Sequence, residues 1–257
     1  MMSGTLFGIG VGPGDPELMT LKAARILATA PVVAYFAKRG NRGTARAIVE
    51  GYLARDVVEI PLYYPFTVEI EADGVAYGGH ITQFYDESAR ELAGHLGAGR
   101  NVAVLCAGDP LFYGSYIYLH DRLARRFESV VVPGVTSIAG CASVARLPLS
   151  STNEVFSVIP GTLPEDLLER RLADADAAAI IKIGRNFAKV RRVLDRLGRL
   201  GDATYVERGT MARQILMPLA EKQDNSNDEV YFSLILLPGH KPEKWRQGTA
   251  QESKAAE

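Results

Sequence analysis

The chain of 257 residues contains only two cysteines and four histidines. Cys106 and Cys141 have neither the number nor the spacing of a disulfide framework or a structural zinc site. The histidines are scattered and show no metal-ligand spacing. We therefore expect two buried thiols in a reducing compartment, and no bound metal.

Long apolar runs and an excess of positive charge are also absent. No stretch is long enough to cross a bilayer, and the first residues lack the positive region of a secretion signal. Lys and Arg number 29 against 30 Asp and Glu, so no general basic field is available to hold nucleic acid. We expect a cytoplasmic protein without a membrane or nucleic-acid partner, which binds any anionic ligand through a local cluster of cations.

Short apolar runs alternate with helical patterns through most of the chain, which is typical of βαβ units and predicts an α/β fold. A stretch rich in Tyr and Gly, 63–85, is irregular and long for a plain connection, which favours a functional loop or lid. In the first half we expect strands over 5–11, 31–36, 57–61, 101–105 and 130–132, and helices over 20–29, 45–53, 86–96, 116–127 and 137–145.

The run RLPLSSTNE, 146–154, has no periodicity and is typical of a hinge or domain boundary. Because the chain exceeds the usual size of one core, we expect two α/β domains, 1–147 and 148–245, followed by a polar tail, 246–257. In the second domain we expect strands over 155–159, 178–183, 203–206 and 230–237, and helices over 164–173 and 187–197.

The stretch GIGVGPGDPEL, 8–18, places glycines at alternate positions where a strand passes into a helix. A dinucleotide fingerprint requires G-x-G-x-x-G, but the third position is Pro13 or Asp15 in the two possible frames. The second expected strand ends on Lys38 and Arg39 instead of an acidic ribose ligand. An NADP-dependent oxidoreductase and a tight turn without any ligand both stay open as alternatives.

Three loops share the same position, after a strand and before a helix. They are Gly10–Pro16, Ala107–Pro110 and Pro133–Ser137, and each is rich in Gly or Pro. Loops at the carboxyl ends of strands in an open α/β sheet line a common crevice. We therefore expect the three loops to surround one medium-sized polar ligand, mainly through backbone groups.

Five segments stand out in order along the chain: GVGPGDPELMTLKAARIL, VAVLCAGDPLFYGS, VVPGVTSIAG, IIKIGR and YVERGT. Together they resemble the tetrapyrrole methylase family of S-adenosylmethionine (SAM) methyltransferases. Within the family, the first two segments and the long 63–85 stretch are most similar to the enzymes that methylate precorrin-2 at C-20.

This resemblance implies two α/β domains with the active site in the cleft between them, a tetrapyrrole trough on the first domain, and a homodimer. It also implies SAM as cofactor and S-adenosylhomocysteine as its product. Ile183 stands where the family often has methionine, and we expect its packing to be kept. The implied cofactor contacts are Pro13, Ala107, Gly108, Asp109, Phe112, Thr136, Ser137, Ile183, Gly209, Ser233 and Leu234.

No Ser/His/Asp or Cys/His constellation is evident in the sequence. Methyl transfer does not require one, because an electron-rich substrate carbon attacks an already electrophilic methyl group and the enzyme supplies alignment. Asp109 is a candidate general base, although a loop-shaping or cofactor-binding role suits its GDP turn better. Glu207 and Arg208 form either a structural ion pair or part of the catalytic site.

A precorrin carries eight carboxylates, so a near-neutral protein must gather cations locally to bind it. Lys38, Arg39, Arg42 and Arg46 lie together in AKRGNRGTAR and are the expected substrate-binding residues. A solvated helix start is the alternative interpretation of this run. Lys182 and Arg185 form a second, weaker candidate pair.

Other functions remain open within and outside the family. A cobalt-factor II C-20 methyltransferase or another precorrin or uroporphyrinogen methylase fits the same segments. An NADP-dependent oxidoreductase would bind NADPH and not SAM, and a non-catalytic tetrapyrrole carrier would show no turnover.

Overall fold

The computed structural model describes residues 2–65, 75–223 and 231–239. The chain divides into two compact units, Met1–Ser137 and Ile138–Glu257. Helix α5 (Ser137–Ala145) belongs to the second unit, since Ile138 and Cys141 are buried among residues of the second sheet. The two units divide at the beginning of α5, between Ser137 and Ile138, whereas the sequence predicted a boundary after the end of this helix, at residue 147.

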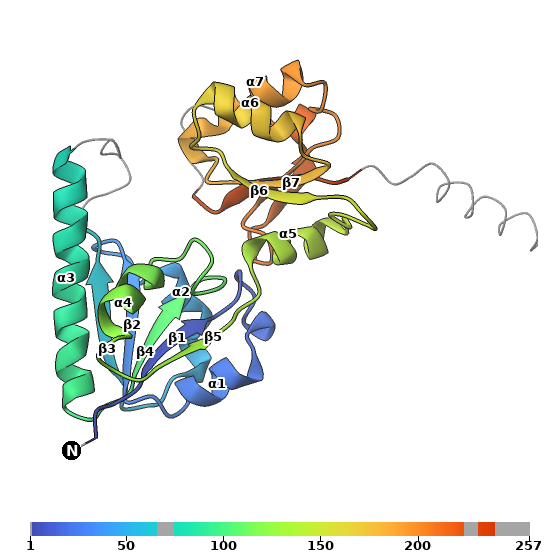
Figure 1. The fold of residues 1–257 in the computed structure, drawn as a ribbon. Helices are drawn as coiled ribbons and strands as arrows, with labels where there is room; N and C mark the ends of the chain where they lie inside the picture. The colour runs from blue at the N-terminus through green and yellow to red at the C-terminus, as the bar shows by residue number, and fades with distance from the viewer. Residues whose placement is uncertain (1, 66–74, 224–230, 240–257) are drawn as a thin grey trace, which may run out of the picture. The chain divides into compact units, whose positions relative to one another are not determined.

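The first unit contains five parallel strands in the order β3-β2-β4-β1-β5 (Figure 1). Hydrophobic runs such as Val102–Cys106 are buried on both faces, as expected for a parallel sheet covered by helices. The strands are β1 (Leu6–Gly10), β2 (Val32–Ala37), β3 (Val58–Tyr63), β4 (Val102–Cys106) and β5 (Ser129–Val132).

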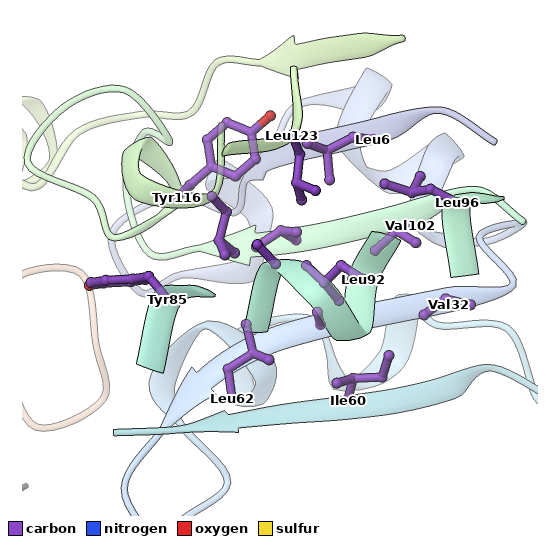
Figure 2. Close-up of a cluster of buried hydrophobic side chains, with 14 of the residues drawn as sticks. Leu6, Val32, Ile60, Leu62, Tyr85, Leu92, Leu96, Val102, Tyr116 and Leu123 are labelled. Atoms are coloured by element: carbon purple, nitrogen blue, oxygen red, sulfur yellow. The ribbon is translucent and has the colours of Figure 1, made fainter. Parts of the chain in front are cut away.

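Helices cover both faces of this sheet, and successive residues of a strand face opposite layers. Val32 packs with Leu92 and Leu119 on the face covered by α3 (Val75–Gly97) and α4 (Tyr116–Leu123), the layer drawn in Figure 2. Val33 instead packs with residues of α1 (Leu21–Leu27) and α2 (Thr44–Ile48). Short 3-10 turns, η1 (Pro16–Leu18) and η2 (Glu50–Tyr52), follow the first loop and α2.

The expectation of an irregular stretch over 63–85 is wrong in part. Strand β3 continues to Tyr63, and α3 begins at Val75 instead of at residue 86. Gly78 and Gly79 are poor helix formers, so the sequence there did not indicate a helix. Further along α3, Ile81, Phe84 and Tyr85 pack against the first core. Residues 66–74 of the proposed lid lie outside the described residues.

The second unit contains a mixed five-stranded sheet in the order β6-β7-β10-β8-β9, in which only β6 and β7 pair in parallel. Helices α6 (Glu165–Ala173) and α7 (Phe187–Arg196) cover one face, and α5 covers the other. The 3-10 turns are η3 (Gly184–Asn186) and η4 (Leu219–Glu221). The strands are β6 (Phe156–Pro160), β7 (Ala177–Ile181), β8 (Thr204–Glu207), β9 (Ile215–Pro218) and β10 (Ser233–Leu237).

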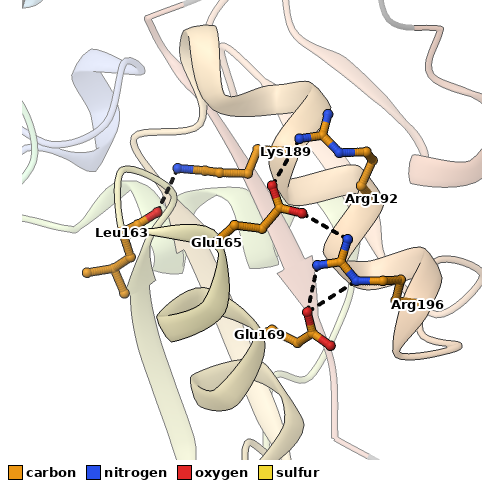
Figure 3. Close-up of polar contacts among 6 residues, drawn as sticks. All are labelled: Leu163, Glu165, Glu169, Lys189, Arg192 and Arg196. Atoms are coloured by element: carbon orange, nitrogen blue, oxygen red, sulfur yellow. Dashed lines mark hydrogen bonds and ion pairs between the residues drawn. The ribbon is translucent and has the colours of Figure 1, made fainter.

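Exposed ion pairs join α6 to α7 (Figure 3). Glu165 accepts hydrogen bonds from Arg192 and Arg196 at 3.0 and 2.8 Å, and Arg196 also pairs with Glu169 at 2.6 Å. Exposed pairs of this kind contribute little to stability individually. Their main consequence is that these cations are neutralised within the helical layer.

No helix within the described ranges is both long and apolar enough to span a membrane.

We predict that Gly8→Ala destabilises the fold. A Cβ at Gly8 would lie 2.5 Å from the ring of Tyr116, which is fully buried, and overpacking of this kind costs about 1–3 kcal/mol. Gly94→Ala is the control, because Gly94 is exposed on α3 with no atom near its Cβ position. Denaturant unfolding should show a loss for the first variant and a gain of about 0.5–1 kcal/mol for the second. Equal stability of Gly8→Ala and wild type would contradict this account.

Candidate functional site

The order of strands in the first unit brings several connecting loops to the same end of the sheet. From β1 the chain crosses to β2 on one side, and from the neighbouring β4 it crosses to β5 on the other side. Ligands in open α/β sheets bind outside the carboxyl ends of the strands where the direction reverses in this way. The loops after β1, β4 and β5 all begin at this end of the sheet.

The first two loops are joined by their backbones. Gly108 N–H donates to Gly12 O at 2.7 Å, and Gly12 N–H donates to Gly108 O at 3.4 Å. Both glycines have left-handed backbones, with φ of +81° at Gly12 and +73° at Gly108. Residues with a side chain rarely adopt this conformation, so both positions favour glycine.

Gly134 brings the third loop against the other two. A Cβ on Gly134 would lie 2.1 Å from Gly108 O, and a Cβ on Gly10 would lie 2.5 Å from Gly134 N. No side chain fits between these backbones. The structure thus brings the three loops together, as their positions after the strands predict.

Asp109 fixes this arrangement through both carboxylate oxygens. Oδ1 accepts a hydrogen bond from Leu111 N at 2.9 Å, and Oδ2 accepts one from Gly134 N at 3.1 Å. The carboxylate therefore shapes its own loop and holds the loop after β5. This geometry favours the loop-shaping interpretation of Asp109 over that of a general base.

The segment beyond Asp109 presents apolar side chains to solvent. Leu111, Phe112 and Tyr113 are 52%, 37% and 48% exposed, and Tyr113 has a left-handed backbone with φ of +56°. The other expected contacts in this unit vary: Pro13 is buried, Ala107 and Ser137 are exposed, and Thr136 is half-buried. Apolar side chains beside bare backbone suit a ligand with a flat apolar ring and several polar groups, which describes a nucleoside-based cofactor such as SAM.

The expected contacts in the second unit mostly serve its own packing. The side chain of Ile183 is buried between the sheet and α7. Leu234 is buried on the opposite face, beneath α5. A Cβ on Gly209 would lie 2.6 Å from Sγ of Cys141, whose pKa burial raises to about 12. Ser233, half-buried, pairs with β8 at the first position of β10.

Glu207 and Arg208 form an ion pair at 2.6 Å. The Glu207 carboxylate is buried and also accepts a hydrogen bond from the Tyr205 hydroxyl at 3.0 Å. Burial, together with the neighbouring carboxylate, raises the pKa of Tyr205, so the phenol stays protonated as a donor. These contacts support a structural role for the pair.

The four expected substrate cations do not form a single open cluster. Arg46 is buried, and its Nε and Nη2 donate to the two oxygens of Glu59 on β3, each at 2.7 Å. Arg42 pairs with Glu50 at 2.8 Å on the surface. Lys38 and Arg39 are exposed, and the Arg39 guanidinium lies 6.0 Å from the ring centroid of Tyr63. Glu59 already occupies two nitrogens of the Arg46 guanidinium, which makes Arg46 less available to a substrate than the other three cations.

No three His, Cys, Asp or Glu side chains approach closely enough to hold a metal ion in the part of the chain that the structure describes.

Residues 5–223 match the Tetrapyrrole (Corrin/Porphyrin) Methylases, and the chain belongs to this family. It is 57% identical to precorrin-2 C(20)-methyltransferase of Sinorhizobium sp over 238 residues, which cover 93% of this chain and 96% of that protein. Identity to cobalt-precorrin-2 C(20)-methyltransferase of Salmonella typhimurium is 27%, over 92% of this chain and 97% of that protein.

Solved structures of the family share the fold. Uroporphyrin-III C-methyl transferase from Thermus thermophilus, complexed with S-adenosylhomocysteine, superposes with a TM-score of 0.65 at 27% identity. The superposition covers 95% of this chain and 100% of the Thermus thermophilus chain. This agreement confirms the α/β fold predicted from the sequence.

We predict that the Arg46–Glu59 pair supports stability above the usual titration range of glutamate. The hydrogen bond from Arg46 lowers the Glu59 pKa in the folded protein, so its stabilisation is complete above the unfolded pKa of about 4.3 and is lost as the pH falls through the folded pKa. Glu59→Gln should therefore lower the melting temperature at pH 7, and the difference from wild type should shrink in acid.

Glu50→Gln is the matched control, because the Arg42–Glu50 pair is 64% exposed at both side chains. It should change the melting temperature little at any pH. A Glu59→Gln protein that melts like Glu50→Gln at pH 7 would show that Arg46 does not depend on Glu59.

Proposed function

We propose that the chain methylates precorrin-2 at C-20 with SAM as methyl donor, giving precorrin-3A in cobalamin biosynthesis. The observation that carries this proposal is the 57% identity, over nearly the whole of both chains, to the Sinorhizobium precorrin-2 C(20)-methyltransferase. Identity to the Salmonella enzyme named for the cobalt-containing substrate is much lower, at 27%. The metal-free tetrapyrrole is therefore the favoured substrate, and the cobalt form is the alternative.

The loops after β1, β4 and β5 fit a role in holding the cofactor. The backbone at Gly108 can approach a ligand closely, since Gly108 has no Cβ and the nearest atoms around its Cβ position lie 3.9 Å away. Phe112 offers an exposed apolar face for a ring. We propose cofactor contacts from Pro13, Ala107, Gly108, Asp109, Phe112, Thr136 and Ser137 in the first unit, and from Ile183, Gly209, Ser233 and Leu234 in the second.

When bound, SAM supplies a methyl group on a positively charged sulfur, which keeps the bonding electrons when the methyl group leaves. The chain's own residues then have to orient the cofactor and the substrate and to exclude water from the site. Asp109 holds the loops after β4 and β5 in fixed positions, and Leu111 and Phe112 offer exposed apolar side chains to the cofactor. Orientation of two reactants supplies a large part of a rate enhancement. We assign no general base among the described residues.

Lys38 and Arg39 are the proposed cations for the tetrapyrrole carboxylates. Both are exposed and follow β2, so they lie at the same edge of the sheet as the cofactor loops. Arg42 is exposed, although Glu50 neutralises part of its charge. Arg46 is the weakest of the four proposed contacts because it is buried with Glu59.

We also propose that the protein acts as a cytoplasmic homodimer. Family membership and the balanced charge support this proposal. Light scattering on purified protein tests the dimer.

The decisive experiment incubates the protein with SAM and freshly made precorrin-2, with and without cobalt, and follows the tetrapyrrole mass. One added methyl group on the metal-free substrate, at C-20 by NMR, is expected. Calorimetry should show binding of S-adenosylhomocysteine and none of NADPH. Saturable NADPH binding without S-adenosylhomocysteine binding would favour the oxidoreductase, and binding without turnover would favour a carrier.

We predict that Gly108→Val abolishes measurable binding of S-adenosylhomocysteine. Its φ of +73° strains a branched residue, and the added side chain projects from the loop proposed to hold the cofactor. Gly198→Val is the matched control, because Gly198 has a φ of +68°, open space around it and a place after α7. Both variants should lose similar stability, about 1–3 kcal/mol, but only the first should lose binding in calorimetry. Wild-type affinity in a folded Gly108→Val protein would remove this loop from the cofactor site.

We predict that the double variant Lys38→Glu and Arg39→Glu raises KM for the tetrapyrrole at least about tenfold, because two attractions to carboxylates become repulsions. Affinity for S-adenosylhomocysteine should not change. The double variant Lys22→Glu and Arg25→Glu, which reverses two exposed charges on α1, controls for net charge. An unaltered KM in the first double variant would show that Lys38 and Arg39 do not bind the substrate and belong to a solvated surface.

A further inference from the structure

The exposed segment between Asp109 and α4 is held at both ends. Asp109 ties its beginning to Gly134 at 3.1 Å. At its end, the Ser115 hydroxyl lies 2.5 Å from the hydroxyl of Tyr64, a residue 51 positions earlier in the chain. The segment 110–114 thus lies between two anchors that reach different loops.

The Ser115 contact is unusual for a serine in this position. Serine before a helix commonly accepts a hydrogen bond from a backbone N–H of the first turn. Ser115 makes no such bond: its backbone is already helical, with φ of −68° and ψ of −15°, and its hydroxyl bonds to Tyr64. The side chain therefore serves a tertiary contact and does not cap α4.

Tyr64 is fixed independently of this contact. Its backbone N–H donates to Ala37 O at 3.1 Å, at the ends of β2 and β3. Its ring stacks on Phe36, with centroids 5.6 Å apart and planes at 21°, and its centroid lies 5.3 Å from that of Phe84 on α3. The hydroxyl is consequently presented to Ser115 from a rigid support.

Burial does little to hold this segment in place. Leu111, Phe112 and Tyr113 gain little from burial, and Tyr113 carries a strained backbone. Exposed segments with few buried contacts open readily, whereas anchored loops are organised before a ligand binds. The anchor also joins the ends of β2 and β3, beside the cations proposed to bind substrate, to the loop proposed to bind cofactor.

We infer that Tyr64 is a positioning residue, which acts through Ser115 to hold segment 110–114, and Phe112 within it, ready for the cofactor. This inference rests on the proposed function. Tyr64→Phe keeps the stacked ring and removes only the hydroxyl. Hydrogen exchange of the 110–114 amides in the free protein should become faster. Affinity for S-adenosylhomocysteine should fall about three- to tenfold, the scale of one hydrogen bond.

The partner and the control are both available in the chain. Ser115→Ala should reproduce the effect of Tyr64→Phe. The double variant should bind S-adenosylhomocysteine no more weakly than either single variant. Ser115→Thr should behave like wild type because it keeps the hydroxyl. Tyr118→Phe is the matched control: Tyr118 stacks on Tyr85 at 4.5 Å and is 50% exposed. This control should leave exchange and affinity unchanged.

Melting temperature, calorimetric affinity and the split between KM for SAM and kcat distinguish the outcomes. Failure of the wild-type protein to bind S-adenosylhomocysteine would overturn the proposed function and the inference with it. If the wild type binds and methylates while Tyr64→Phe matches it in exchange and affinity, the inference alone fails. A lower melting temperature with unchanged affinity and KM would assign Tyr64 a purely structural role and would also overturn the inference.

Discussion

The close approach of three backbones, at Gly10, Gly108 and Gly134, is the constraint on which the candidate site depends. Strands β4 and β5 both pair with β1, so the loops that follow them leave the sheet side by side. Their backbones approach so closely that a methyl group on Gly134 would overlap the Gly108 carbonyl. The loops can keep this spacing only without side chains at these positions, and Asp109 then adds a hydrogen bond to the third loop.

The alternating glycines of the first strand answer to separate requirements. Gly8 makes room for the buried ring of Tyr116, Gly10 admits the third loop, and Gly12 adopts a left-handed backbone. None of these requirements involves a pyrophosphate. This explains why the stretch is rich in glycine and yet fails the dinucleotide fingerprint, which the sequence alone left as an unresolved alternative.

Much of the first unit was predictable because buried parallel strands are continuous apolar runs and the turns after them contain Gly and Pro. The beginning of α3 was not, because Gly78 and Gly79 have weak helix propensity and the residues around them gave no helical pattern. Strand β9 has only four residues, mostly exposed, and gave too weak a pattern to identify. In the site, the loops were predictable from their positions, but two partners were not. Glu59 meets Arg46 and Tyr64 meets Ser115 only because of strand pairing and packing, which leave no local signal in the sequence.

The chemical groups near the three loops are largely committed to holding structure. Both oxygens of Asp109 accept backbone hydrogen bonds. The Cys106 thiol at the end of β4 is buried, and this burial, together with the charge of Asp109, raises its pKa far above neutrality, so it does not act as a thiolate nucleophile. A site built in this way suits a reaction whose electrophile and leaving group arrive together on one cofactor and whose nucleophile is the substrate. In such a reaction the protein contributes mainly through the fixed relative positions of its loops, and those positions depend on the glycine contacts and on the anchors at Asp109 and Ser115.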